Sequence, residues 1–264
     1  MISFALPMIM LGAALAQGPH PQGVEKNVLD MNVELVSLLG QKLYRTPAEG
    51  DALKALESAL AEAEKHAEAQ PDNAAVHVER AQALGALWRY HDAAQAYTKA
   101  ISLAPADSEL FSHRGNIFIL LRQFDQAKMD YEQATAIAPQ IANGWLGLGI
   151  THYLRQKFED AAKAFAEASR LPMMDAEKDV AGFWSELTQR RLGKPANASA
   201  PGWAWMTAYV AGLDRLLAGD KPGALVAWHT IADNAADWPM LPHITAEADI
   251  AALEGSKKMK AITF

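Results

Sequence analysis

The sequence predicts an all-α fold, a solenoid of stacked helical hairpins with irregular helical caps. One observation is the 34-residue spacing of Pro71, Pro105 and Pro139. A second is that small and aromatic residues recur at the same period: Ala93, Tyr97 and Ala100; Ala127, Tyr131 and Ala134; Ala161, Phe165 and Ala168. A period of this length is typical of stacked helical repeats, so a single elongated helical body is expected.

Each repeat is predicted to contain a helix A and a helix B joined by a short turn. In the first repeat, helix A is expected over residues 74–87 and helix B over residues 92–103. Pro105 ends helix B, because proline cannot donate the backbone hydrogen bond that would continue it. Small residues at one site of helix A are expected to admit the aromatic ring of helix B: Ala81, Gly115 and Gly149 against Tyr97, Tyr131 and Phe165.

The third repeat has the fullest set of recurring residues: Trp145, Leu148, Gly149, Tyr153, Ala161, Phe165 and Ala168. This pattern resembles the tetratricopeptide repeat (TPR) family, although Tyr153 lies one place later and Pro172 one place earlier than usual. The resemblance covers residues 73–172. It implies a right-handed superhelix whose concave surface is lined by helix A side chains and binds a peptide or a partner helix.

The resemblance places a partner-binding site on these A helices. The candidate residues are Val78, Gln82 and Gly85 in the first repeat, Ser112, Asn116 and Ile119 in the second, and Asn143, Leu146, Ile150 and Tyr153 in the third. Their side chains are apolar or amide, so a largely neutral groove is expected. Some chaperone-binding members of the family hold a C-terminal carboxylate with basic residues, but Val78, Asn143 and Gly147 occupy those sites here. Such a clamp is not expected.

The remaining chain is divided by composition and by partial agreement with the repeat. Residues 202–239 are expected to form a degenerate fourth hairpin, because Gly212, Ala224, Trp228 and Ile231 repeat part of the pattern. The full division is 1–16 signal peptide, 17–72 N-terminal helical cap, 73–172 three TPR units, 173–201 inserted helix and loop, 202–239 degenerate hairpin, and 240–264 C-terminal helix and tail.

The first residues favour export. Residues 2–16 carry no charge and end in Ala14-Leu15-Ala16, a small-x-small pattern that suits signal peptidase, so the mature chain is expected to begin at Gln17. The alternative is a short buried N-terminal helix. A periplasmic or secreted location is therefore predicted, with no membrane span in the mature chain.

Composition excludes several classes of function. The net charge is -7 and the pI about 5.6, so no diffuse basic surface is available and a nucleic-acid partner is not expected. Cysteine is absent, which removes disulfides, thiolate catalysis, cysteine-bound zinc and the lipid-attachment cysteine of a lipoprotein. The oligomeric state has no signature in the sequence.

No catalytic motif, metal ligand set or cofactor site is predicted. The histidines are scattered, and His77 and His113 on successive A helices are interpreted as a chance pair. The predicted function is a non-catalytic protein-protein interaction scaffold or adaptor of the bacterial cell envelope, or an assembly chaperone. The alternative is a cryptic enzyme or small-ligand-binding protein that uses the tryptophans of the C-terminal third: Trp184, Trp203, Trp205, Trp228 and Trp238.

Overall fold

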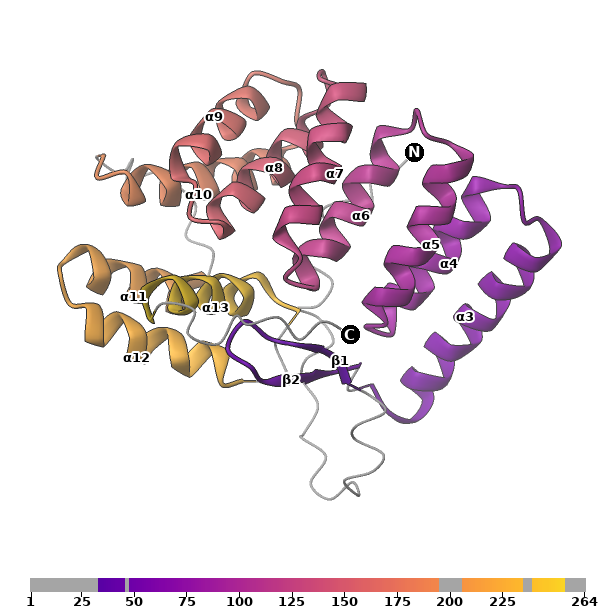
Figure 1. Cartoon of the computed structure of the whole chain (residues 1–264), viewed down its shortest axis with the longest axis horizontal. Coiled ribbons are helices and arrows are strands. Elements are labelled where there is room, and N and C mark those ends of the chain that lie inside the picture. The colour runs from indigo at the N-terminus through magenta and orange to yellow at the C-terminus, as the bar shows by residue number, and fades with distance from the viewer. Residues whose placement is uncertain (1–32, 46–47, 195–205, 235–238, 255–264) are drawn as a thin grey trace. The chain divides into compact units, whose positions relative to one another are not determined.

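Helices form most of the structure. The computed structural model describes residues 33–45, 48–194, 206–234 and 239–254 (Figure 1). Within these residues the all-α prediction is confirmed, with one addition. An antiparallel hairpin of β1 (Val33–Val36) and β2 (Lys42–Tyr44) precedes the helices. It was not predicted, because strands of three and four residues are too short to establish an alternating pattern.

The predicted repeat helices are all present, in the expected order. They are α3 (Gly50–Ala69), α4 (Ala74–Ala86), α5 (Tyr90–Leu103), α6 (Ser108–Leu120), α7 (Phe124–Ile137), α8 (Ala142–Leu154) and α9 (Phe158–Ser169). Helices α4, α6 and α8 are the A helices, and α5, α7 and α9 the B helices. Helix α5 begins two residues before its predicted start, and it ends before Ala104-Pro105 as expected.

Four further helices follow the repeats: α10 (Asp175–Arg191), α11 (Thr207–Leu217), α12 (Lys221–Ala232) and α13 (Leu241–Glu254). Helix α10 is the predicted inserted helix. Helices α11 and α12 pack closely against each other and form the predicted degenerate hairpin, and α13 packs chiefly against α12. No helix among the described residues is long and apolar enough to cross a membrane.

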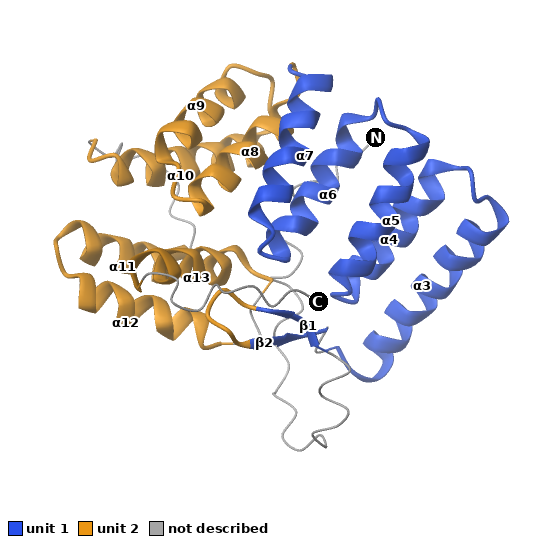
Figure 2. Cartoon of the chain, viewed as in Figure 1, with its two compact units in different colours: residues 1–36, 42–139 blue, residues 37–41, 140–264 orange. Residues whose placement is uncertain are grey.

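The chain divides into two compact units (Figure 2). Unit 1 contains residues 1–36 and 42–139, and unit 2 contains residues 37–41 and 140–264. In unit 1, helices α3 to α7 lie side by side, each packed against the next in sequence (Figure 1). The division falls between the second and third predicted repeats, so the A helices α4 and α6 belong to unit 1 and α8 to unit 2.

A close contact between a glycine of one helix and an aromatic ring of the next recurs in three of the helical hairpins. A Cβ atom added to Gly149 would lie 2.5 Å from Cε1 of Phe165, and one added to Gly212 would lie 2.3 Å from Nε1 of Trp228. At Gly115 the nearest atoms belong to Tyr131, at 3.0 Å. Each small residue precedes its aromatic partner by 16 residues. The predicted register is therefore confirmed for the second and third repeats, and it extends to the hairpin of α11 and α12.

The turn between helix A and helix B also repeats. Trp88, Arg122 and Gln156 lie 34 residues apart and have φ angles of 55°, 59° and 60°. These left-handed residues follow the C-caps of α4, α6 and α8, where a residue of this conformation closes the helix end. Non-glycine residues adopt it at some conformational cost, which the surrounding packing offsets.

One buried carboxylate, that of Glu34, joins the β-hairpin to helix α5 within unit 1. Oε1 of Glu34 accepts a hydrogen bond of 2.7 Å from the backbone N–H of His91, in the first turn of α5. Oε2 of the same side chain accepts from Nε of Arg45 at 3.2 Å. A negative charge at a helix N-terminus stabilises the helix, so Glu34 caps α5 from a distant part of the sequence.

Several predictions concern residues outside the described ranges. These are the signal segment and its cleavage site before Gln17, and the tryptophans Trp203, Trp205 and Trp238. They stay predictions.

Candidate partner-binding surface

In unit 1, the candidate residues differ in how accessible they are. Val78 and Gln82 on α4 are half-buried, and no hydrogen bond of the Gln82 carboxamide lies within the described residues. On α6, Ser112 and Asn116 are buried, and Ile119 has no exposed surface. The expectation that the A helices share one accessible face is therefore wrong for α6.

The amide of Asn116 is used within the fold. The hydroxyl of Tyr131 on α7 donates a hydrogen bond of 2.6 Å to Oδ1 of Asn116, and both side chains are buried. A buried polar group without a partner is costly, so this pair stabilises the hairpin of α6 and α7. The prediction that Asn116 projects from a face that no neighbouring helix needs is wrong, because the helix of its own repeat uses it.

In unit 2, most of the candidate residues on α8 are also buried. Asn143 is half-buried, whereas Leu146, Ile150 and Tyr153 are 3%, 4% and 0% exposed. Helices α10 and α13 contact α8, and the hydroxyl of Tyr153 lies 2.8 Å from that of Tyr209 on α11. The predicted solvent-facing placement of these three residues is wrong, since helices outside the repeat cover this side of α8.

A buried polar network surrounds Tyr153. Tyr209 donates a hydrogen bond of 2.6 Å to Oδ2 of Asp249 on α13, and Nη1 of Arg191 on α10 lies 2.9 Å from Oδ1 of the same carboxylate. Nε2 of Gln156 also donates to Oδ1, at 2.9 Å. A carboxylate only accepts hydrogen bonds, so the hydroxyl of Tyr209 donates to Asp249. The hydroxyl of Tyr153 in turn donates to the oxygen of Tyr209.

Burial keeps the phenols of this network neutral. It raises the pKa of Tyr209 well above its ordinary value, and the charge of Asp249 raises it further. Burial raises the pKa of Tyr153 in the same way. The guanidinium of Arg191 lies 4.5 Å from the ring centroid of Phe158, an arrangement that favours a cation. The network therefore connects α8, α9, α10, α11 and α13, and it is part of the core of unit 2.

The tryptophans of unit 2 that the structure describes fill the core. Trp184 and Trp228 have no exposed surface, and Nε1 of Trp228 donates a hydrogen bond of 3.0 Å to the backbone oxygen of Tyr209. Trp184 contacts Tyr153 edge to face, with ring centroids 5.2 Å apart. Both residues serve packing, and neither presents a surface to a ligand.

His77 and His113, on the A helices of unit 1, each contact another group of this unit. Nε2 of His77 lies 2.9 Å from the backbone oxygen of Pro71, and the ring of His113 stacks on Tyr97 with centroids 5.7 Å apart. In the described part of the chain, no group of three or more metal-ligating side chains is close enough to bind an ion.

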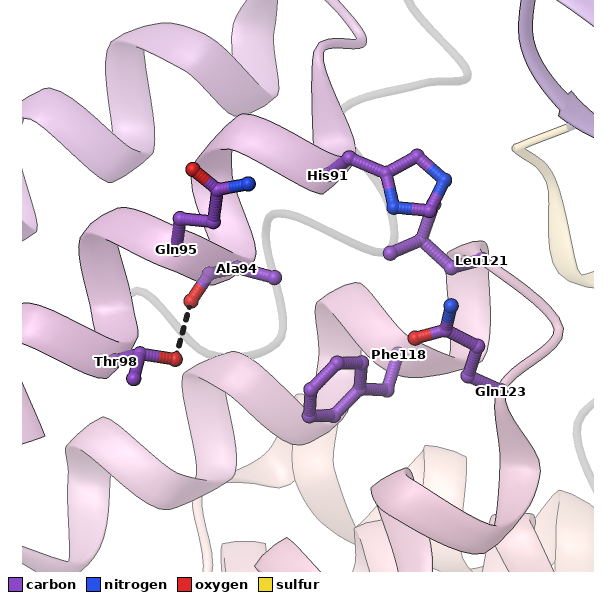
Figure 3. A pocket seen from close by; sticks show the side chains of 7 residues that line it. All are labelled: His91, Ala94, Gln95, Thr98, Phe118, Leu121 and Gln123. Atoms are coloured by element: carbon purple, nitrogen blue, oxygen red, sulfur yellow. Dashed lines mark hydrogen bonds between the residues drawn. The ribbon is translucent and has the colours of Figure 1, made fainter. Parts of the chain in front are cut away.

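A pocket lies elsewhere in unit 1, at a place that the sequence analysis did not identify. Its volume is 330 Å³, and it lies between α5 and the end of α6 (Figure 3). It is lined by His91, Ala94, Gln95, Thr98, Phe118, Leu121 and Gln123. His91, Ala94, Gln95 and Thr98 are three or four residues apart and so lie on one face of α5. This spacing is the only feature of the sequence that could have indicated the pocket.

Comparison with known families identifies the repeats. The family model described as tetratricopeptide repeat matches residues 74–107 and 108–141, which contain α4 to α7. Residues 74–141 are therefore two tetratricopeptide repeats. The third predicted unit, α8 and α9, lies outside the matched residues and has the same kind of contact, between Gly149 and Phe165.

Curated proteins with TPR units are similar to parts of this chain. Human "Tetratricopeptide repeat protein 13" is 29% identical over 130 residues, which are 48% of this chain and 15% of that protein. The "Heat-shock protein cognate (HSC) co-chaperone sgt12" of Aspergillus fumigatus is 28% identical over 116 residues, 42% of this chain and 33% of that protein. The chain spans a third or less of the length of these relatives.

A solved structure, the "Arabidopsis OM64 TPR domain", is 23% identical and covers 44% of this chain and 94% of its own, with a TM-score of 0.42.

In terms of the TPR groove, the accessible candidates are few. Val78, Gln82 and Asn143 are half-buried, and none of them is charged. Gly147, at the remaining site where a carboxylate clamp would need a basic residue, is buried in α8. The accessible candidates are therefore one aliphatic side chain and two amides, on α4 of unit 1 and α8 of unit 2.

Proposed function

We propose that this protein is a non-catalytic interaction scaffold or adaptor of the bacterial cell envelope, which binds a peptide or helix of a partner protein on the A helices of its TPR units. The observation that supports it is the half-exposed side of α4, where Val78 offers an aliphatic group and Gln82 a carboxamide with no partner among the described residues. A carboxamide both donates and accepts hydrogen bonds, so it complements a peptide backbone.

The partner is expected to be neutral where it contacts α4. Binding without ion pairs is screened little by salt, so the affinity should change little between low and physiological ionic strength. One relative, which is similar to part of this chain, is described as a co-chaperone. A chaperone tail that ends in a clamped carboxylate is not the proposed partner here, because Val78, Asn143 and Gly147 provide no cation.

The experiment is capture of partners from an envelope extract of the source organism with the full chain as bait. Val78→Ala with Gln82→Ala should abolish capture and keep the melting temperature. The matched control is Lys99→Ala, an exposed residue of α5, which should capture as the parent does. Equal capture by the α4 variant would place the partner elsewhere.

Export is part of the proposal and has its own test. N-terminal sequencing of the protein purified from the periplasm or culture medium should begin at Gln17. Full-length protein recovered from the cytosol would contradict the envelope location and leave the binding proposal to the capture experiment.

A further inference from the structure

The pocket between α5 and α6 has an apolar floor and a polar rim. Ala94 and Leu121 are buried, and Phe118 is half-buried between them and solvent. His91 and Gln95 on α5 and Gln123 at the N-cap of α7 surround this floor (Figure 3). Pockets for small ligands occupy about 300 to 1,000 Å³, so 330 Å³ is room for a small group only.

The rim groups have hydrogen-bonding capacity to spare. In the described part of the chain, the side chains of His91, Gln95 and Gln123 have no hydrogen-bond partner. Thr98 is different, because its hydroxyl donates to the backbone oxygen of Ala94 at 2.8 Å and accepts from Nη1 of Arg114 at 2.9 Å. Two carboxamides that have no partner among the described residues therefore lie at the rim of a small apolar floor.

Charged ligands are not favoured here. No lining residue is an acid, a lysine or an arginine. Arg114, the nearest cation to Thr98, is held by two hydrogen bonds to the carboxylate of Asp130, at 2.7 and 2.8 Å. Desolvating a charged ligand group in this pocket would have no compensating ion pair.

We infer that this pocket binds one uncharged apolar side chain of a partner peptide, and that Gln95 and Gln123 bind the backbone amides on either side of it. The inference rests on the proposed protein-binding function and adds a site that includes none of the predicted groove residues. A peptide fits better than a sugar, since hydroxyl groups on the floor of Ala94, Phe118 and Leu121 would find no hydrogen-bond partners.

Blocked tripeptides test the inference directly. Ac-Gly-Leu-Gly-NH₂ added to the isotopically labelled full chain should shift the side-chain amide NMR signals of Gln95 and Gln123. The matching peptides with Gly, Lys or Glu in the central position should leave these signals unchanged. Methyl β-glucoside is the sugar probe and should also leave them unchanged.

Variants assign the contact. Gln95→Ala and Gln123→Ala should each weaken binding of the leucine peptide about threefold to tenfold, the effect of one lost hydrogen bond. Gln126→Ala is the matched control, because Gln126 is an exposed glutamine of α7 outside the pocket. Ala94→Met should fill the floor and abolish binding, with folding checked by circular dichroism.

Each result decides the inference. A shift of the amide signals by the leucine peptide alone, lost in the pocket variants and kept in Gln126→Ala, supports it. No shift, an equal shift by the lysine peptide, or a shift by the glucoside overturns it. These failures are distinct from failure of the proposed function, because partner capture depends on Val78 and Gln82 and is measured separately.

Discussion

Helix α4 of unit 1 and helix α8 of unit 2 occupy the same position in their repeats, yet their surfaces are used differently. On α4, Val78 and Gln82 are half-exposed, whereas the equivalent Leu146 and Ile150 on α8 are buried. The repeat pattern is kept in both, because Ala81 of α4 and Gly149 of α8 are each followed 16 residues later by a buried aromatic ring, Tyr97 and Phe165. The difference shows that the repeat determines packing within a hairpin, while neighbours outside it determine which side remains open.

The largest expected effect on stability comes from breaking the polar network that covers this side of α8. Asp249→Ala removes the carboxylate that accepts from Tyr209, Gln156 and Arg191, and leaves the buried Arg191 charge without its partner. We expect a loss of about 3 to 5 kcal/mol in the free energy of unfolding, the cost of breaking a buried ion pair. Urea unfolding measures it. Asp179→Ala, an exposed acid on α10, should change stability by less than about 0.5 kcal/mol.

The next effect concerns the contact between a glycine of helix A and an aromatic ring of helix B, which occurs in hairpins of both units. Gly149→Leu should cost about 1 to 3 kcal/mol or more, because even a Cβ atom would lie 2.5 Å from Phe165. Gly149→Ala should cost more than Gly115→Ala, where the nearest Tyr131 atoms are 3.0 Å away. Thermal unfolding of the three variants measures these differences.

The control is Gly182 on α10, which has open space around it, so Gly182→Ala should stabilise by about 0.5 to 1 kcal/mol. Equal effects at all three glycines would contradict the close-contact explanation.

A smaller effect compares two tyrosines of unit 1. Tyr131→Phe removes the buried hydrogen bond from the Tyr131 hydroxyl to Oδ1 of Asn116 and should cost about 1 to 2 kcal/mol. Tyr97 occupies the same place one repeat earlier, but its buried hydroxyl has no hydrogen-bond partner in the structure as described. Tyr97→Phe should therefore leave stability unchanged or raise it. A larger loss for Tyr97→Phe in urea unfolding would show that its hydroxyl has a partner.

The smallest expected effect is a pH dependence from His113. Burial lowers the pKa of this imidazole, and the opposing charges of Glu109 and Asp107 do not restore it. Below about pH 6.5 the unfolded chain binds a proton that the folded chain does not, so stability falls as the pH drops toward the folded-state pKa. The slope is at most about 1.4 kcal/mol per pH unit for one proton. His113→Phe should reduce this slope between pH values of about 7 and 5.5, and an unchanged slope would exclude His113 as its source.

Much of the fold was predictable, because the information is local. The helix boundaries follow from Pro105 and Pro139, and the contact between helix A and helix B follows from one small residue placed 16 positions before one aromatic. The same spacing between Gly212 and Trp228 identified the degenerate hairpin. These features depend on residues within one repeat, which a period in the sequence reveals.

The candidate surface was less predictable, because its accessibility depends on residues far away in the sequence. Tyr153 is buried by Tyr209 and Trp184, which belong to helices outside the repeat. The capping of α5 by Glu34 spans 57 residues and was not predicted for the same reason. A family pattern gives the positions that usually face a partner, and it contains no information on helices outside the repeat.

Helix α13 also affects the order in which the protein can be completed during synthesis. Residues 243–250 of this helix are all buried, and they include His243, Glu247 and Asp249. Asp249 bonds to residues that are made 40 to 93 positions earlier. Those residues must therefore wait for α13 to leave the ribosome before their hydrogen bonds can form. Unit 1, whose helices pack against their neighbours in sequence, can form those helix contacts while unit 2 is still being translated.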